Sequence, residues 1–326
     1  MFGYYSLLAL IAGFILDMIV GDPRVIPHPV QIMGLLISAL EKLFRRIFPR
    51  TDTGEKIAGL MLWLIVVILT GGISLVLLLF CYKLSPWIGF VVETVMCWQC
   101  LAAKSLRDES MKVKKALDSG DLAASRSAVS MIVGRDTESL DEAGVTRAAV
   151  ETVAENASDG VIAPLFFLIL FGGPLGMVYK AVNTMDSMLG YMDPPYTNIG
   201  LIPAKADDVL NYVPSRIAAM FLLFAGGLLG YDTKAGMSAF RRDRYKHASP
   251  NAAQTESVMA GLLGVRLAGS AFYRGVLHKK DYIGDDLRPI EPEDIARSCS
   301  IMLLASMFAL LLFGGLKLTL FLLITK

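Results

Sequence analysis

A regularly spaced set of charged residues lies just before an apolar stretch of the chain. Arg147, Glu151, Glu155 and Asp159 recur every fourth residue, and in a helix this spacing places them on one face. Carboxylate oxygens are the ligands that Mg²⁺ prefers, and a guanidinium suits the charge of a phosphate. The set therefore predicts either a metal or phosphate site or a solvated polar helix face.

Further polar clusters lie at the edges of other apolar segments. Each mixes carboxylates with an amide or a cation, and ionisable groups at membrane depth usually mark function. An interfacial salt bridge is the alternative for each cluster, and His28, between two prolines, is a candidate general base or a structural residue. The clusters are Asp17, Asp22 and His28; Arg135, Asp136 and Asn156, which join the first set; Lys180, Asn183, Asp186 and Ser187; Lys205, Asp207, Asp208, Asn211 and Arg216; and Asn251 with Glu256.

The composition is that of a membrane protein. Hydrophobic residues make up 54% of the 326 residues and charged residues only 19%, with a mean hydropathy of +0.54. The formal net charge is +1, so the charge balance gives no argument for a nucleic-acid partner. The C-x-x-C sequence at Cys97 and Cys100 lies in an apolar segment without a second cysteine pair, which favours packing over a zinc site.

Six apolar segments are candidates to cross the bilayer, which takes about 20 apolar residues. We predict an all-α, polytopic integral membrane protein with five to six transmembrane or re-entrant helices and helical cytoplasmic insertions. The first segment is short and reads as a retained anchor, and Gly172-Gly173-Pro174 breaks the fourth. The segments are Tyr4–Val20, Ile57–Cys81, Pro86–Ala102, Val161–Val182, Pro214–Gly230 and Ile301–Ile324.

The distribution of Lys and Arg predicts the orientation, because cytoplasmic loops are enriched in these residues. Basic residues are concentrated at 45–56 and at 104–115. We therefore expect a protein of the cytoplasmic membrane, folded as a single membrane-embedded domain over 1–326. The polar segments 103–160 and 231–300, and the active site with them, are expected on the cytoplasmic side.

Residue chemistry alone leaves three functional classes open. A corrinoid or other transporter would place polar residues mid-span in related halves. A membrane phospho-alcohol transferase is suggested by Asp159-Gly160 before an apolar helix, although Ala163 is followed by Pro164 instead of the Arg of that motif. A membrane-bound ATP-dependent ligase is the third class, and the chain lacks the common P-loop and dinucleotide-binding motifs.

Six strings, in this order, resemble the adenosylcobinamide-phosphate synthase family of cobalamin biosynthesis. The similarity extends from about Leu16 to Gly275, and one departure is Gln254-Thr255, where many family members carry Trp-Pro. The strings are LDMIVGDPRVIPHPV, GRDT, ETVAENASDGVIAPLF, KAVNTMDSMLGY, ADDVLNYVPSRIAA and SPNAAQTESVMAGLLGVRLAG.

The resemblance implies an amide synthetase that uses ATP and Mg²⁺ and needs no tightly bound prosthetic group. Its substrates would be adenosylcobyric acid and (R)-1-aminopropan-2-ol phosphate or free aminopropanol, and its partners membrane lipid and the later nucleotide-loop assembly enzymes. An acyl-phosphate intermediate is our hypothesis, with an acyl-adenylate as the alternative. Candidate residues are Glu151, Glu155, Asp159 and Asp186 for catalysis, the last three also as Mg²⁺ ligands; Arg135, Lys180, Lys205 and Arg216 for phosphate; Asp22, Asn156, Asn183, Asp208 and Asn211 for orientation; and His28, Asn251 and Glu256 for substrate binding.

Overall fold

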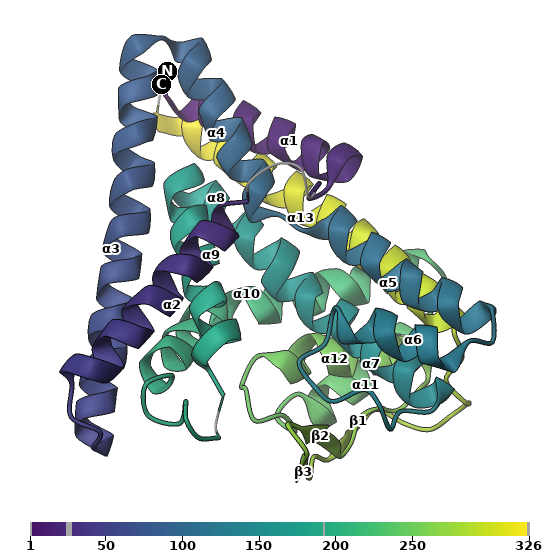
Figure 1. The fold of residues 1–326 in the computed structure, drawn as a ribbon. Helices are drawn as coiled ribbons and strands as arrows, with labels where there is room; N and C mark the ends of the chain where they lie inside the picture. The colour runs from purple at the N-terminus through teal and green to yellow at the C-terminus, as the bar shows by residue number, and fades with distance from the viewer. Residues whose placement is uncertain (1, 24–27, 192, 325–326) are drawn as a thin grey trace. The chain divides into compact units, whose positions relative to one another are not determined.

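Over the residues that the structure describes, the chain is helical with four very short strands, and Figure 1 shows the arrangement of the helices. The computed structural model describes residues 2–23, 28–191 and 193–324. The predicted all-α class is confirmed. The elements are α1 Phe2–Val20, α2 Pro29–Ile47, α3 Asp52–Leu84, α4 Pro86–Cys100, α5 Ala103–Asp118, α6 Leu122–Ser130, α7 Glu142–Asn156, the π-helical turn η1 Ala157–Ile162, α8 Ala163–Phe171, α9 Gly173–Leu189, α10 Leu201–Leu228, α11 Thr233–Asp243, α12 Ala252–Leu263, β1 Leu267–Ala268, β2 Ala271–Tyr273, β3 Val276–His278, β4 Tyr282–Ile283 and α13 Glu293–Ile324.

The chain folds into two compact units, each built from separated segments. The first unit contains Met1–Ala102, Pro164–Asn211 and Leu312–Lys326; the second contains Ala103–Ala163 and Tyr212–Leu311. In the first, α1 packs against α4, and α3 packs against α4 and α9. In the second, α7 packs against α5, α6, α12 and β1, and α11 packs against α12. Parts of the long apolar helices belong to both units, so the single-domain prediction and the cytoplasmic placement of its polar segments stay predictions.

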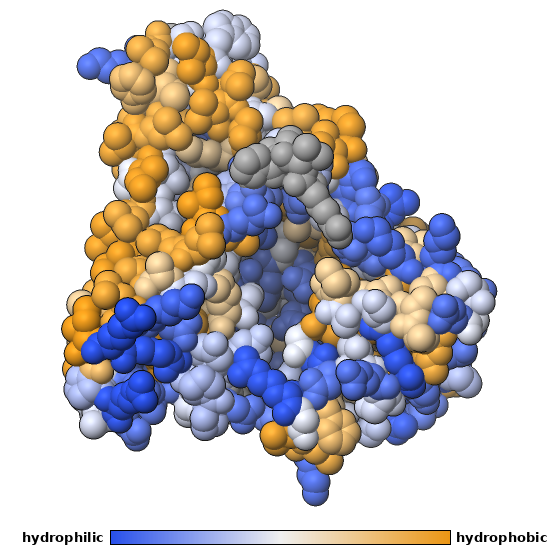
Figure 2. Space-filling model, viewed as in Figure 1, coloured by the Kyte–Doolittle hydropathy of each residue, from blue (hydrophilic) through white to orange (hydrophobic). Residues whose placement is uncertain are grey.

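Five helical stretches in the described part of the chain are long and apolar enough to cross a membrane, which makes this a multi-pass membrane protein. Residues on the outer face of α3, such as Ile68, Ile73 and Val76, are more than 60% exposed, as expected of a lipid-facing helix. Figure 2 shows apolar surface along the stretch that Figure 1 labels α3. The stretches are Asp52–Leu84, Pro86–Asp118, Glu142–Phe171, Leu201–Leu228 and Glu293–Thr319, with Tyr4–Val20 as a shorter apolar helix.

The predicted bounds of the fourth span, 161–182, are wrong. The helix that enters this region begins at Glu142, after its N-cap Asp141, and ends at Phe171. Gly172 then takes a left-handed φ of 72°, where a Cβ would collide with the Glu93 carboxylate, and α9 begins directly after it. The predicted break is therefore confirmed, but the charged residues of 147–159 belong to the spanning-length helix itself and do not precede it.

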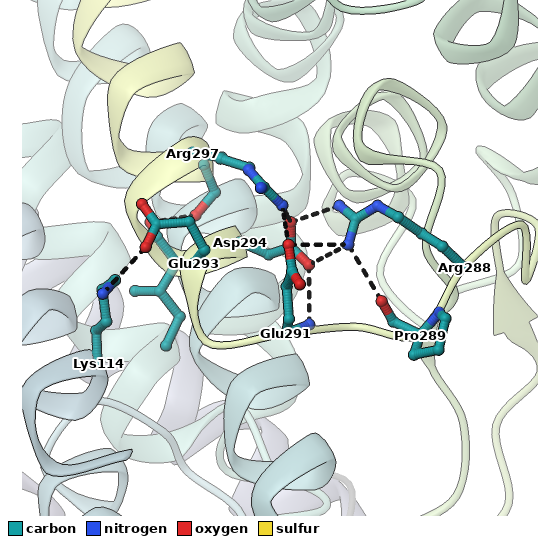
Figure 3. A network of polar contacts seen from close by, with 9 residues as sticks. Lys114, Arg288, Pro289, Glu291, Glu293, Asp294 and Arg297 are labelled. Atoms are coloured by element: carbon teal, nitrogen blue, oxygen red, sulfur yellow. Dashed lines mark hydrogen bonds and ion pairs between the residues drawn. The ribbon is translucent and has the colours of Figure 1, made fainter. Parts of the chain in front are cut away.

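A buried carboxylate fixes the start of α13 in the second unit (Figure 3). Asp294 is fully buried and accepts hydrogen bonds from Arg288 Nη1 at 2.8 Å, Arg297 Nη1 at 2.9 Å and the Glu291 amide at 3.0 Å. Such charge-assisted bonds are stronger than neutral ones. The network thereby joins the loop after β4 to the first turn of the last long helix.

Candidate functional site

The second unit contains a small polar cavity of about 140 Å³. Helices α7 and α12 supply carboxylates to its wall, and the loop before α7 and the strand region supply cations and an aromatic ring. Ligand pockets for larger molecules usually measure roughly 300–1,000 Å³, so this cavity suits a small molecule or one end of a larger one. Its lining residues are Arg135, Glu151, Glu155, His247, Glu256, Ala268, Gly269, Tyr273 and Lys280.

Glu151 is the most firmly held carboxylate of this cavity. Its Oε2 pairs with Nη2 of Arg135, and its Oε1 accepts the Ala268 amide at 2.7 Å. The Glu151 side chain is only 4% exposed and that of Arg135 17% exposed. Ala268 takes a left-handed φ of 58°, a strained conformation for a residue with a Cβ. The Glu151 carboxylate thus compensates the Arg135 charge and fixes the strained backbone at the cavity wall.

Asp136, the next residue in the GRDT string, holds the hairpin of β2 and β3. Its carboxylate accepts the amides of Arg274 at 3.1 Å and Gly275 at 2.7 Å. Both residues have positive φ, as in a two-residue type I′ hairpin turn. The Asp136 amide donates in turn to the Phe272 carbonyl at 2.8 Å. Asp136 therefore positions the strands that bring Tyr273 to the cavity.

Glu155 and Glu256 bring two further carboxyl groups to the cavity. Glu155 lies one turn after Glu151 on α7, as its spacing predicts. Glu256 is 4% exposed, and its buried Oε2 has no hydrogen-bond partner within the part of the chain that the structure describes. Burial and the charges of Glu155 and Glu151 raise the pKa of Glu256 well above its ordinary value. These surroundings therefore disfavour the ionised form of Glu256.

Three cavity residues with functional side chains, His247, Tyr273 and Lys280, were not predicted from the sequence. Lys280 Nζ donates to the Tyr273 hydroxyl at 2.9 Å and lies 4.9 Å from its ring centroid. His247 Nδ1 accepts the Ser249 amide at 3.0 Å, and burial, with the charge of Lys280, lowers the pKa of His247 to about 4. No spacing pattern links these residues to α7. Only the position of His247, just before the SPNAAQTES string, could have drawn attention to it.

The π-helical turn η1 changes the register of the charged set on α7. Asp159 lies inside this wider turn, so it leaves the every-fourth-residue face that Glu151 and Glu155 share. Asn156 precedes the turn and donates from Nδ2 to the Thr152 carbonyl at 3.0 Å, a bond within its own helix. Arg147 donates from Nε to the Arg266 carbonyl at 3.2 Å, which ties α7 to the segment before β1.

A second cluster of predicted residues in this unit lies where α10 meets the start of α12. Asn251 Oδ1 accepts from Ser215 Oγ and from Arg216 Nη1, both at 3.3 Å. The Arg216 guanidinium also lies 3.6 Å from the Tyr212 ring centroid and donates to the Tyr212 carbonyl at 2.6 Å. These hydrogen bonds use only Nη1 of Arg216, and they support a positioning role for Asn251.

In the first unit, α9 and α10 share a buried polar network centred on Asp207. Its carboxylate accepts from Asn211 Nδ2 at 2.9 Å and from Asn183 Nδ2 at 3.3 Å. Asn211 Oδ1 accepts the Tyr179 hydroxyl at 2.8 Å. The sequence named Asn183 in one polar cluster and Asp207 and Asn211 in another, but it did not join the two clusters.

The remaining predicted residues of the first unit lie in separate local settings. Lys205 pairs with Asp208 at 3.3 Å, one helical turn later on α10. Asp22 lies 3.6 Å from His28 Nε2, and His28 Nδ1 caps α2 by accepting the Val30 amide. Lys180 and Asp186 are on α9; the Lys180 carbonyl accepts from Thr184 Oγ1 and the Asp186 carbonyl from the Gly190 amide.

The predicted Mg²⁺ ligands do not form a protein-built metal site. Over residues 2–23, 28–191 and 193–324, no group of three His, Cys, Asp or Glu side chains is placed to hold a metal ion. The cavity carboxyls also have Arg135 and Lys280 beside them, which disfavours a divalent cation. The donor set therefore does not fit a resident Mg²⁺.

The cavity and its supporting contacts fall within the part of the chain that known proteins share. The profile of the family described as CobD/Cbib protein matches residues 10–302. The cobalamin biosynthesis protein CobD of Klebsiella pneumoniae is 45% identical over 312 residues, which cover 96% of this chain and 98% of the relative. CobD of Clostridium perfringens is 44% identical over 296 residues, 91% of this chain and 93% of the relative.

CbiB of Salmonella typhi, also a cobalamin biosynthesis protein by name, is 44% identical over 308 residues, 94% of this chain and 96% of the relative. No solved structure matches the chain. The family profile and these relatives each cover most of the chain, and they confirm the resemblance found in the sequence. The chain therefore belongs to the CobD/CbiB family of cobalamin biosynthesis proteins.

Proposed function

We propose that the protein is an ATP-dependent amide synthetase of cobalamin biosynthesis. It joins the amine of (R)-1-aminopropan-2-ol phosphate, or of the free alcohol, to a propionate carboxyl of adenosylcobyric acid. The observation that carries the proposal is the second-unit cavity. There Glu256 Oε2, buried and without a hydrogen-bond partner among the described residues, lies in one small space with the cation Lys280. An amidation needs a group that takes a proton from an ammonium and cations that hold anionic groups.

The chemistry proposed is activation of the carboxyl by ATP followed by attack of the amine. Mg²⁺ enters with ATP as the ion of the nucleotide phosphates, since the cavity residues do not fit a resident ion. Glu151 holds Arg135 and the strained Ala268 backbone in place, so its role is positioning. The lining carboxyls Glu155 and Glu256 are the proposed reactive groups. The proposed site faces the cytoplasmic side of the cell membrane, where the corrinoid and the amine donor are soluble. Later nucleotide-loop enzymes are its proposed partners.

Purified protein incubated with adenosylcobyric acid, aminopropanol phosphate, ATP and Mg²⁺ tests the proposal. We expect an amide product by mass spectrometry, with ADP released if the intermediate is an acyl phosphate and AMP if it is an acyl adenylate. Glu155→Ala should lower turnover strongly. Glu138→Ala, a change of an exposed glutamate in the loop before α7, is the control and should leave turnover unchanged. Corrinoid uptake into vesicles without amide formation would contradict the proposal and favour a transporter.

A further inference from the structure

We infer that the second-unit cavity is the subsite of the amine donor and that it selects the phosphorylated amino alcohol over the free one. In this subsite the ammonium lies against Glu155 and Glu256, and the phosphate lies against Lys280 and Tyr273. The inference rests on the proposed function, which leaves open where each substrate binds. It assigns a location, an orientation and a specificity determinant to the smallest of the three substrates.

The volume of the cavity limits its occupant. A cavity of about 140 Å³ is half the lower end of the usual range of roughly 300 Å³ for ligand pockets. A corrinoid or a nucleotide triphosphate exceeds this space many times, whereas a short amino alcohol phosphate is of the right size. Most of ATP and most of the corrinoid must therefore lie outside it, and only one end of either could enter.

The acidic and basic groups of the cavity come from separate parts of the fold. Glu155 on α7 and Glu256 on α12 make the helical wall acidic, whereas Lys280 and Tyr273 come from the strand region. Glu151 does not disturb this separation, because its charge is already compensated by Arg135. A molecule with an ammonium at one end and an anion at the other matches both walls at once.

The part of the cavity that would bind the phosphate has unused hydrogen-bond donors. Lys280 forms no ion pair with any carboxylate in the described part of the chain, and only one of its three N–H donors is used, toward the Tyr273 oxygen. Since that oxygen accepts from Lys280, the Tyr273 hydroxyl can turn its own proton toward a ligand. A phosphate placed between them would receive hydrogen bonds from both. The free amino alcohol lacks the negative charge that Lys280 would bind.

The ammonium of the donor would supply the hydrogen-bond partner that Glu256 lacks among the described residues. Its Oε2 is buried without a hydrogen-bond partner among the described residues, a costly state that an ammonium donor would relieve. An arriving ammonium also favours the ionised carboxyl. In the reaction, Glu256 takes one proton from the ammonium, and the freed nitrogen pair attacks the ATP-activated carboxyl to form the C–N bond. The C–O bond to the activating phosphoryl group then breaks with its electron pair leaving on oxygen, and the departing phosphate takes the second proton that the nitrogen loses.

Calorimetric binding of each amine donor alone to the full-length protein in detergent tests the subsite without catalysis. Wild type should bind aminopropanol phosphate at least about tenfold more tightly than aminopropanol. Lys280→Met should remove this preference by weakening only the phosphorylated donor, and Glu256→Gln should weaken both donors. Lys279→Met, a change of the exposed neighbouring lysine, is the matched control and should bind like wild type. Thermal unfolding of each variant checks that it is folded.

A Lys280→Met variant that is folded and keeps the full preference for the phosphorylated donor overturns the subsite, as does equal loss in the Lys279 control. Amide synthesis in the same preparations separates this result from a failure of the proposed function. If amide forms but donor binding ignores Lys280 and Glu256, the subsite is wrong and the function stays supported. If donor binding follows the expected pattern but no amide forms with corrinoid and ATP, the function is wrong and the subsite is kept.

Discussion

Two glutamates of the same cavity should respond to the same substitution with opposite changes in stability. Glu151→Gln removes the charge that compensates Arg135 and leaves a largely buried guanidinium behind, because the Arg135 side chain is only 17% exposed. Removing one partner of a buried ion pair costs about 3–5 kcal/mol. We expect a loss near 3 kcal/mol, the lower end, since Arg135 keeps some exposure.

Glu256→Gln removes a carboxyl that is buried beside two others and has an unsatisfied oxygen. An unsatisfied buried polar group costs about 1–3 kcal/mol, and an amide both relieves the repulsion and supplies a donor toward Glu155. We therefore expect a gain of about 1–2 kcal/mol at neutral pH. At about 2 °C per kcal/mol for a chain of this size, the melting temperature should fall by about 6 °C in Glu151→Gln and rise by about 2–4 °C in Glu256→Gln.

The pH dependence of the Glu256 effect follows from its raised pKa. In wild type the unfolded chain releases this proton near the ordinary carboxyl pKa, whereas the folded protein keeps it to higher pH, so stability falls as pH rises above about 4.3. Glu256→Gln lacks this loss. The melting temperatures of the variant and wild type, recorded by intrinsic fluorescence between pH 5 and 8, should diverge as pH rises. A destabilised Glu256→Gln, or a difference that shrinks toward pH 8, would refute the reasoning.

Three further predictions concern the supports of the site. Asp136→Asn removes the charged acceptor of the two hairpin-turn amides and so weakens both hydrogen bonds. Hydrogen exchange over 271–278 should speed up by about tenfold or more, while exchange in the rest of the chain is unchanged. Asp294→Asn leaves Arg288 and Arg297 without their buried carboxylate and should lower stability by about 3 kcal/mol; an unchanged melting temperature would contradict this role. The pKa of His247 is lowered to about 4 in the folded protein, so as the pH falls the unfolded state binds this proton before the folded state does. The melting temperature should therefore fall from pH 6.5 toward pH 4, and His247→Asn should reduce this slope.

Much of the architecture was predictable because it depends on local patterns. Long apolar runs predicted the membrane-length helices. Asp121 and Asp141 cap two of the polar helices, a position where Asp is strongly favoured. The break at Gly172 followed from its glycines and proline. The short strands were not predicted, because two or three residues are too few to show an alternating pattern. The bounds of the fourth span failed because the helix continues through the polar residues that the hydropathy pattern placed outside it.

The sequence by itself determined the family, the helical membrane fold and the shared face of Glu151 and Glu155, since strings, apolar runs and helical spacing are properties of neighbouring residues. Only the tertiary structure decided which other groups meet that face. Lys280 and His247 reach it from segments more than ninety residues away in the chain, and η1 removes Asp159 from its register. It also divided the roles of the glutamates: Glu151 is paired and Glu256 is not, because pairing and burial depend on contacts between distant segments that spacing does not encode.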